Sequence, residues 1–246
     1  MEDELLDAMY RDAERHWWFR ARRRIVFSLL DRHYARSDGR VLDLGCGVGN
    51  NLAALKRYGE TWGADSSPRA LEYCRRDFRG RLDEVILPDR VPYPDDTFDL
   101  IVMFDVLEHV ADDLAAARRV FRLLRPGGLL ALTVPALRWL WSRHDVEHHH
   151  QRRYHRPELR RVLREAGFEV LKLSYMNCFL LPAMAAARLL LPAKVTSARD
   201  LSAGARPAAR ILEAVFASER HLLKIANLPV GGSLVAICRR PPSGVQ

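Results

Sequence analysis

The chain has 246 residues, of which 48% are hydrophobic and 28% charged, with a formal net charge of +8. This composition is that of an ordinary soluble globular protein, and no separate tail or linker is needed to account for it. Its four cysteines form no C-x-x-C pair, which argues against a disulfide framework or a thiolate metal site. The acidic start, MEDELLDAMY, resembles neither a signal peptide nor a transit peptide, so we expect a cytoplasmic protein.

Arginine carries nearly all of the positive charge, since the sequence has only four lysines. A basic surface favours anionic partners such as nucleic acid, phospholipid or phosphorylated acceptors. A preference for arginine codons over a solvated surface would give the same composition. The charge by itself therefore selects no partner.

Helical spacing of apolar residues over residues 1–36 predicts an N-terminal helical segment. Beyond it, short apolar runs alternate with amphipathic segments, which indicates a parallel sheet covered by helices. The predicted strands are 40–44, a second strand ending at Asp65, 85–87, 98–104, 129–134, 168–175 and 233–239, and the predicted helices are 50–57, one beginning near Pro68, 111–124 and 157–166.

A long insertion, residues 177–232, separates the sixth and seventh predicted strands. A connection of this length usually has its own structure or its own role. The apolar stretch from Cys178 to Pro192 is too short to cross a bilayer, and an amphipathic helix follows it. The insertion is interpreted either as a cap that receives a hydrophobic or lipid-linked acceptor, with peripheral membrane contact, or as a helical pair packed on the sheet or on a partner subunit.

The segment VLDLGCGVGN places a G-x-G-x-G turn between a strand and a helix, with Asp43 two residues before the first glycine. Glycines let the backbone turn sharply and approach a ligand closely. Asp65 ends the next strand, where a carboxylate can accept both ribose hydroxyls of a nucleotide. An acid beside the turn suits a cationic ligand and would repel a pyrophosphate, so the pattern favours S-adenosylmethionine (SAM) over NAD.

These segments, with YPDDTFDLIVMFDVLEHV and LRPGGLLALTVP, resemble the class I SAM-dependent methyltransferases over residues 38–176 and the last strand. The resemblance implies one Rossmann-like α/β domain over residues 1–246, with a seven-stranded, mostly parallel sheet, an antiparallel last strand and helices on both faces. Asp89 is either the acid that binds adenine or a turn-forming residue. The implied cofactor-binding residues are Asp43, Gly45, Cys46, Gly47, Gly49, Asp65, Ser66, Asp89, Phe104 and Asp105.

Two segments supply candidate residues for the acceptor side. The first is Asp105-x-x-Glu108-His109, which follows the fourth strand. Similar segments bind magnesium in some quinone-biosynthesis methyltransferases but occur widely in the superfamily without a metal, so we expect His109 to line the site and no metal to bind. The second is the histidine-rich loop WLWSRHDVEHHHQRRY, whose spacing matches no metal site.

In that loop we predict His150 as the general base or acceptor-orienting residue, with Asp145 and Tyr154 as support. Arg152 or Arg153 would bind an anionic acceptor, although each residue of the loop could equally be a solvated or bracing side chain. The resemblance to the class I methyltransferases implies that the helical segment 1–36 is a lid over the site. Trp17 and Trp18 then either wall the acceptor pocket or pack in the core. HWWFRARR, VPALRWLWSRHD, H-x-R-R-Y and LPVGGSL together resemble one bacterial methyltransferase group whose acceptors are not established.

The predicted acceptor is a small or lipid-linked molecule methylated at oxygen. FDVLEHV follows the fourth strand in place of the Asn/Asp-Pro-Pro-aromatic motif of amino-group nucleic-acid enzymes, which argues against an RNA or DNA acceptor despite the basic charge. A SAM-binding protein without catalysis is the alternative outside enzymes.

Overall fold

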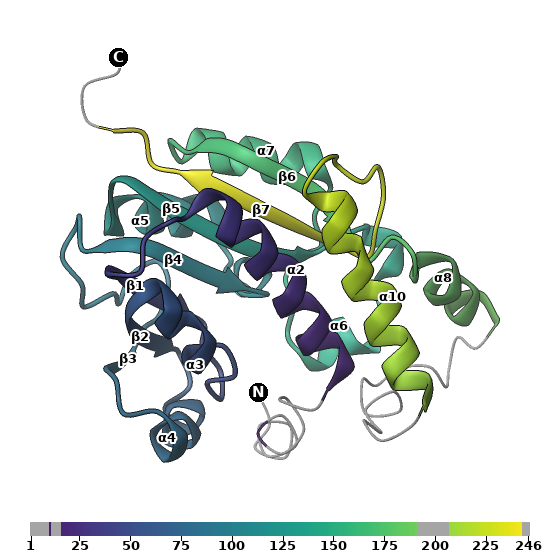
Figure 1. Ribbon diagram of the computed structural model, residues 1–246, viewed down its shortest axis with the longest axis horizontal. Coiled ribbons are helices and arrows are strands. Elements are labelled where there is room, and N and C mark those ends of the chain that lie inside the picture. Colours follow the sequence, from purple (N-terminus) through teal and green to yellow (C-terminus); the bar gives the residue numbers. More distant parts are fainter. Residues whose placement is uncertain (1–9, 11–15, 191–206, 243–246) are drawn as a thin grey trace.

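The computed structural model describes residue 10 and residues 16–190 and 207–242 of the chain. Parts of the predicted N-terminal lid and of the predicted insertion therefore lie outside the described residues. Figure 1 shows a central sheet with helices packed around it. The fold is a three-layer α/β arrangement, as the alternation of strands and helices in the sequence predicts.

Seven strands form one sheet in the order β3-β2-β1-β4-β5-β7-β6. Neighbours from β3 to β5 pair in parallel, whereas β7 is antiparallel to both β5 and β6. This confirms the mostly parallel sheet with an antiparallel last strand. The strands are β1 (Gly39–Leu44), β2 (Gly59–Asp65), β3 (Leu82–Glu84), β4 (Phe98–Phe104), β5 (Leu124–Pro135), β6 (Glu169–Met176) and β7 (Ser233–Arg239).

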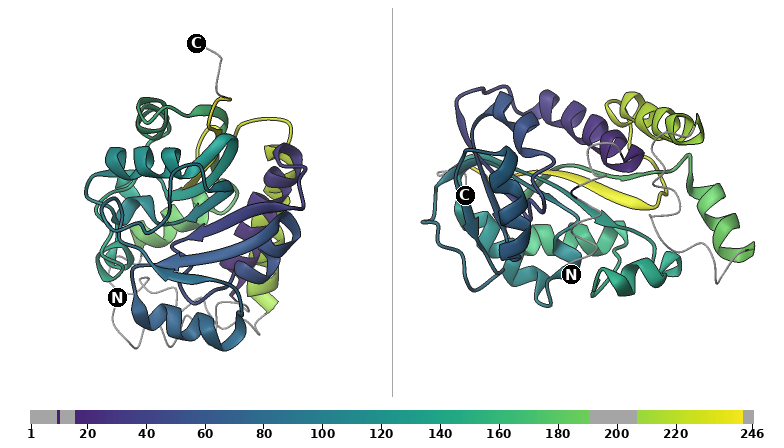
Figure 2. Two further views of the ribbon diagram at one scale, coloured as in Figure 1. Left: turned by 90° about the vertical axis from the view of Figure 1, so that its left-hand side faces the viewer. Right: turned by 90° about the horizontal axis from the view of Figure 1, so that it is seen from below.

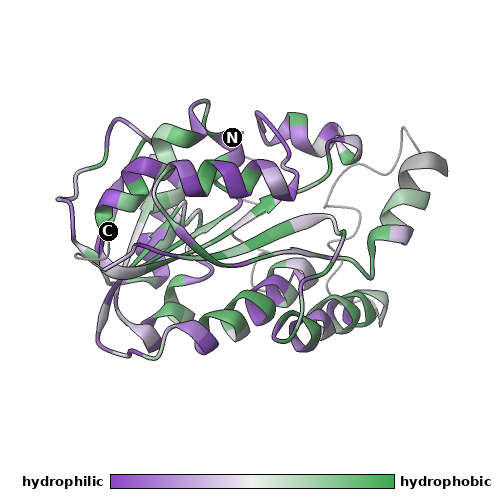
Figure 3. Ribbon diagram, turned by 90° about the horizontal axis from the view of Figure 1, so that it is seen from above, coloured by the Kyte–Doolittle hydropathy of each residue, from purple (hydrophilic) through white to green (hydrophobic). Residues whose placement is uncertain are grey.

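Helices cover both faces of the sheet, with α2 and α10 on one side and α5 and α7 on the other (Figure 2). Several helices show apolar residues toward the strands and polar residues outward (Figure 3), which is the pattern that buries one stripe of a helix. The described helices are α2 (Trp17–His33), α3 (Leu52–Leu55), α4 (Pro68–Asp77), α5 (Asp113–Leu123), α6 (Arg143–Glu147), α7 (Arg156–Glu165), α8 (Leu181–Leu190) and α10 (Pro207–Leu223), with 3-10 turns at Lys56–Tyr58, Leu107–His109 and Arg138–Leu140.

The third strand lies earlier than predicted, at Leu82–Glu84 instead of residues 85–87. Residues 86–90 form a turn in which the backbone groups of Ile86 and Arg90 exchange hydrogen bonds of 2.9 and 2.8 Å. Because this turn takes up the backbone groups that a longer strand would use, β3 ends before it. The predicted helix 50–57 is also shorter, since it divides into α3 and a 3-10 turn.

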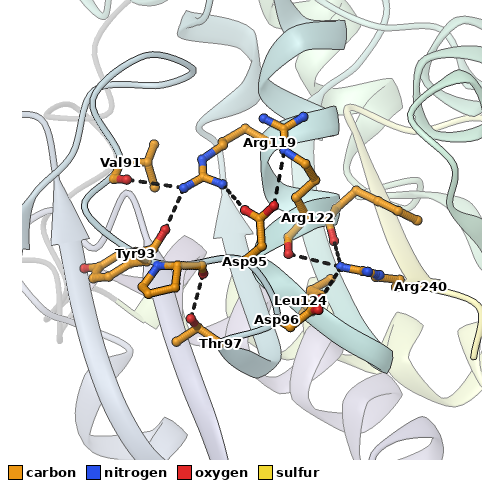
Figure 4. A network of polar contacts seen from close by, with 11 residues as sticks. Val91, Tyr93, Asp95, Asp96, Thr97, Arg119, Arg122, Leu124 and Arg240 are labelled. Carbon is orange, nitrogen blue, oxygen red and sulfur yellow. Dashed lines mark hydrogen bonds and ion pairs between the residues drawn. The ribbon is translucent and has the colours of Figure 1, made fainter. Parts of the chain in front are cut away.

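A polar network closes the end of the sheet opposite the glycine turn (Figure 4). Arg119 on α5 donates to the carbonyl of Tyr93 at 2.6 Å and pairs with Asp95. Arg240, just after β7, donates to the carbonyl of Leu124 at 2.7 Å and pairs with Asp96 at the same distance. These contacts fix the amino end of β4. Ligands of open α/β sheets bind at the opposite edge, beyond the carboxyl ends of the strands.

Helix α10 packs along α2, which brings the insertion against the N-terminal segment (Figure 1). The ring of Trp18 stacks on Phe216 with centroids 4.8 Å apart. The buried carboxylate of Glu219 accepts the backbone N–H groups of Asn177 and Phe179 at 2.7 and 2.8 Å, which anchors the chain after β6. Among the described residues, no helix has the length and apolar character needed to cross a membrane.

Candidate active site

The order of the strands across the sheet reverses at β1. From β1 the chain adds β2 and β3 on one side, and β4 then returns to pair with the other side of β1. Ligands of open α/β sheets bind at this switch point, beyond the carboxyl ends of the strands. The glycine turn follows β1 there, and the N–H groups of Gly45 and Cys46 both donate to the carbonyl of Ala64. Gly47 has φ +53°, and a side chain added to it would meet nothing within 4 Å, so this face of the turn is open.

Asp65, at the end of β2, connects the glycine turn to the start of α4. Its Oδ2 accepts the N–H of Gly47 at 2.8 Å and its Oδ1 accepts the N–H of Ser67 at 2.9 Å. Burial raises the pKa of Asp65, and these backbone donors lower it. The carboxylate thus sets the shape of the turn at the position predicted to bind ribose, while Ser66 beside it is exposed.

Asp43 is fully buried beneath the glycine turn, and neither of its carboxylate oxygens has a hydrogen bond of good geometry. Burial raises the pKa of Asp43 to about 7, although the nearby Asn51 side chain and the charge of Arg22 lower it. A buried acid without a partner is costly unless a cation or donor completes it. The ammonium of SAM supplies such a cation, so this acid and the open face of Gly47 fit the predicted cofactor.

Arg22 on α2 reaches across the carboxyl end of the sheet and forms an ion pair with Asp105, the residue after β4. The other oxygen of Asp105 accepts the hydroxyl of Thr133 at 2.9 Å. The Arg22 guanidinium also lies over the rings of Phe19 and Phe104, 5.2 and 5.5 Å from their centroids. Asp105 and Phe104, both predicted to bind cofactor, therefore border the site together with an arginine from the N-terminal segment.

The remaining predicted cofactor residues differ in their placement. Cys46 and Gly49 face Cys74 on α4, with the two thiol sulfurs 3.9 Å apart. Asp89 is exposed within the 86–90 turn, which fits its interpretation as a turn-forming residue. Its adenine-binding role stays a prediction, as do the contacts predicted for the other cofactor residues.

On the acceptor side, Asp145 is fully buried and orients His150. Nδ1 of His150 lies 2.9 Å from Oδ1 of Asp145. Arg153 donates to both oxygens of the same carboxylate, at 2.7 and 3.0 Å, and the Ser142 N–H donates to it at 2.8 Å. Burial by itself raises the pKa of Asp145, but the contacts with His150 and Arg153 lower it well below the ordinary value.

Tyr154 and Arg152 both contact Asp113, whereas Arg153 between them contacts Asp145. The Tyr154 hydroxyl donates to Asp113 at 2.8 Å, and Nη1 of Arg152 pairs with the same carboxylate oxygen at 2.8 Å. Tyr154 is buried and its hydroxyl braces α5, and its predicted support of the Asp145–His150 pair stays a prediction. Both predicted acceptor-binding arginines are engaged within the chain, and an acceptor role for either stays a prediction.

The loop that carries His150 lies against the 3-10 turn after β4. The N–H of Gln151 donates to the carbonyl of Glu108 at 2.8 Å, and the rings of His109 and His150 meet edge to face with centroids 4.8 Å apart. Glu108 is fully buried with neither oxygen hydrogen-bonded, and burial followed by the charge of Asp105 raises its pKa well above the ordinary value. Burial and the neighbouring His150 lower the pKa of His109 to about 4.

Among the described residues, Glu108, His109 and His150 form a group with potential metal-ligating atoms within 4.8 Å of one another. The two tryptophans predicted to wall the acceptor pocket are the first two residues of α2. Trp17 is buried and Trp18 packs on α10, which fits core packing.

The comparisons with known proteins identify the domain. Residues 15–173, more than half of the chain, match the family described as a methyltransferase domain. The chain belongs to this family. A probable SAM-dependent methyltransferase of Mycolicibacterium smegmatis is 33% identical over 175 residues, which cover 64% of this chain and 62% of the relative.

Other relatives of this methyltransferase domain have diverse names. The 27-O-demethylrifamycin SV methyltransferase of Amycolatopsis mediterranei is 30% identical over 105 residues, which cover 39% of this chain and 39% of the relative. The tRNA N(3)-methylcytidine methyltransferase of Drosophila melanogaster is 33% identical over 48% of this chain and 40% of the relative. The chain thus spans less than two thirds of each of these relatives. A putative methyltransferase of Haloferax volcanii, solved in complex with Trm112, shares the fold at 20% identity, with a TM-score of 0.64 over 99% of this chain and 97% of that one.

Sequence reasoning did not assign a role to two residues of this methyltransferase site, Arg22 and Glu108. Arg22 occupies the apolar stripe of α2, three and four residues before the buried Ile25 and Val26. An arginine on a buried stripe is a signal that it pairs with an acid inside the fold. Glu108 was part of the candidate segment Asp105-x-x-Glu108-His109, but that pattern gave no sign of its complete burial.

Proposed function

We propose that this protein transfers the methyl group of SAM to a hydroxyl oxygen of a small or lipid-linked acceptor. When bound, SAM supplies an electrophilic methyl group on a positively charged sulfur. Asp43, Gly47 and Asp65 would hold it at the carboxyl ends of β1 and β2. Positioning of the acceptor oxygen against that methyl group supplies much of the acceleration in such a displacement.

The Asp145–His150 pair carries the proposal for oxygen. A hydroxyl must lose its proton as its oxygen forms a bond to carbon, and a positioned imidazole assists that loss. Asp145 holds the ring of His150 from one side at 2.9 Å, and Arg153 keeps the carboxylate charged. His150 lies against His109, which belongs to the 3-10 turn that follows β4.

The test is a methyl-transfer assay with labelled SAM and three acceptor classes: soluble hydroxyl compounds, isoprenoid-linked sugars and total tRNA. We expect label in a hydroxyl acceptor, located at oxygen by mass spectrometry of the product. We also expect His150→Ala and Asp145→Asn to lower kcat at least 100-fold while SAM binding changes less than threefold. Label confined to tRNA, or undiminished turnover by His150→Ala, would refute the proposal.

Peripheral membrane contact is proposed for the face of the insertion that carries Ile211, Leu222 and Ile225. Their exposed fractions are 64%, 39% and 80%, and Arg210 and Lys224 are their neighbours in sequence. Exposed apolar residues flanked by basic side chains suit an anionic membrane surface. Co-sedimentation with anionic vesicles at low salt should occur and should weaken in Ile211→Ser/Ile225→Ser; no binding of the intact protein would eliminate this contact.

A further inference from the structure

We infer that Glu108, His109 and His150 form a binding site for a divalent zinc-class ion on the acceptor side of the methyl-transfer site. The inference rests on the proposed function only for the role of the ion, whereas the site itself follows from the described residues. Their ligand atoms come from the turn after β4 and from the loop before α7, and they lie within 4.8 Å of one another.

Glu108 is the strongest evidence for a ligand at this position. Its side chain has no exposed surface, and both of its oxygens lack a hydrogen-bond partner. A buried acid of this kind is costly unless something completes it. The two arginines whose charges act on Glu108 are paired elsewhere, Arg22 with Asp105 and Arg153 with Asp145. A cation held between Glu108 and the two imidazoles would supply the missing partner.

His150 has the environment of a metal-binding histidine. Metal-bound histidines commonly use one ring nitrogen as ligand and the other for a hydrogen bond to a carboxylate, which fixes the ring orientation. Here Nδ1 of His150 lies 2.9 Å from the buried Asp145, which Arg153 holds on its other edge. The ring is therefore positioned before any ligand arrives, with Nε2 as its second nitrogen.

The composition of the group selects the ion. Imidazole nitrogen suits zinc, nickel, iron and copper, whereas magnesium prefers a shell of oxygen ligands. Asp105, the first acid of the Asp105-x-x-Glu108-His109 segment, is paired with Arg22 and accepts the Thr133 hydroxyl. Two imidazoles and one carboxylate remain, which is a set used by catalytic zinc sites that keep a fourth position open.

The fit requires a small adjustment. Zinc bonds of roughly 2.0–2.2 Å place neighbouring ligand atoms roughly 3.3 Å apart, so the present spacing must shrink by about 1.5 Å at most. Rotation of the His109 side chain at the rim can supply most of this movement. With the ion bound, His150 would serve as a ligand in place of a general base. The open position would take the acceptor hydroxyl, whose O–H becomes more acidic on the ion, and the proton would leave to solvent as the oxygen bonds to the methyl carbon.

Zinc binding to the full-length protein tests the site without reference to turnover. Chelator-treated protein is titrated with ZnCl₂ by calorimetry, and with Co²⁺ to record the visible absorption of the bound ion. We expect one ion per chain. His109→Ala and His150→Ala should each lower zinc affinity at least 100-fold, and Asp145→Asn should lower it roughly 10–100-fold through the orientation of His150.

His149→Asn is the matched control, because it removes an exposed imidazole from the same loop. His149 has φ +55°, a conformation that asparagine tolerates, so this variant should fold and bind zinc within twofold of the parent. Glu108→Gln preserves the shape of the buried side chain, and circular dichroism verifies its fold. It should lower zinc affinity and abolish the cobalt spectrum.

Two results would overturn the inference: zinc affinity in His109→Ala within threefold of the parent, or parent protein binding zinc no more tightly than His109→Ala/His150→Ala. The outcomes for the two proposals differ. Specific zinc binding without methyl transfer to any hydroxyl acceptor refutes the proposed function alone. Methyl transfer to oxygen by a protein that binds no zinc refutes the metal site alone.

Discussion

Arg153 donates a hydrogen bond to each carboxylate oxygen of Asp145, with Nε 2.7 Å from Oδ1 and Nη2 3.0 Å from Oδ2. Both side chains are buried, and Asp145 also contacts the ring of His150 and the N–H of Ser142. The neighbouring Arg152 instead pairs with Asp113 and is 30% exposed. Two adjacent arginines thus have different surroundings, and this difference gives a direct prediction.

Arg153→Met should destabilise the protein by about 3–5 kcal/mol, since it leaves a buried carboxylate without its main partner. Arg152→Met should cost about 1 kcal/mol or less, because its pair is partly solvated. Urea unfolding of both variants measures the difference. If Arg153→Met does not fold, Arg153→Lys keeps the charge and should still lose part of the stability together with kcat. Equal costs for the two methionine variants would contradict the assignment. A raised acceptor KM in Arg152→Met at unchanged stability would assign Arg152 to the acceptor.

SAM affinity should rise with pH up to about 7 and then level off. The folded pKa of Asp43 is about 7, against an ordinary value of 3.8. Below pH 7 the acid is protonated in the free protein, and a cationic ligand must displace that proton, so affinity falls by up to tenfold per pH unit.

The same shift destabilises the ligand-free protein as pH rises. At pH below 3.8 the acid is neutral in both the folded and unfolded states. Between pH 3.8 and 7 it is ionised only in the unfolded state, so the free energy of unfolding falls as pH rises, and above pH 7 the loss is constant. Asp43→Asn should flatten both profiles near pH 7. Calorimetric SAM titrations from pH 5.5 to 8.5 provide the measurement, and a parent profile as flat as that of Asp43→Asn would disprove the shift.

Replacing Asp65 should disable the cofactor site more than it destabilises the fold. Asp65→Ala removes the acceptor for the Gly47 and Ser67 N–H groups and the predicted ribose contact, so SAM affinity should fall at least 100-fold. Glu60→Ala is the control, because Glu60 is exposed on the same strand. Calorimetry with SAM and with its demethylated product measures the effect. Unchanged uptake by Asp65→Ala would place the cofactor elsewhere.

Arg22→Met should loosen α2 from the carboxyl end of β4. The variant leaves Asp105 with only the Thr133 hydroxyl, and the pair is partly buried, so we expect a loss of about 2–4 kcal/mol. Arg32→Ala, an exposed arginine on the same helix, should cost less than 0.5 kcal/mol. In a double-mutant cycle with Asp105→Asn the losses should be clearly less than additive. Additive losses would show that the two side chains do not interact.

The sequence by itself determined the fold class, the cofactor and the family. Those features depend on local patterns: the apolar runs of the strands, the glycines after β1, and Asp65 at the end of β2. Local patterns also misplaced β3, because the competing backbone hydrogen bonds of the 86–90 turn leave no trace in hydrophobic periodicity.

Only the tertiary structure decided what the acceptor side contains. Glu108 and His150 are 42 positions apart, and the spacing of the histidines in the loop matches no metal site along the chain. Packing of the loop before α7 against the turn after β4 brings these residues together. The same folding pairs Tyr154 and Arg152 with Asp113. Contacts of this kind depend on which loops meet at the carboxyl edge of the sheet, and sequence spacing carries no information about that meeting.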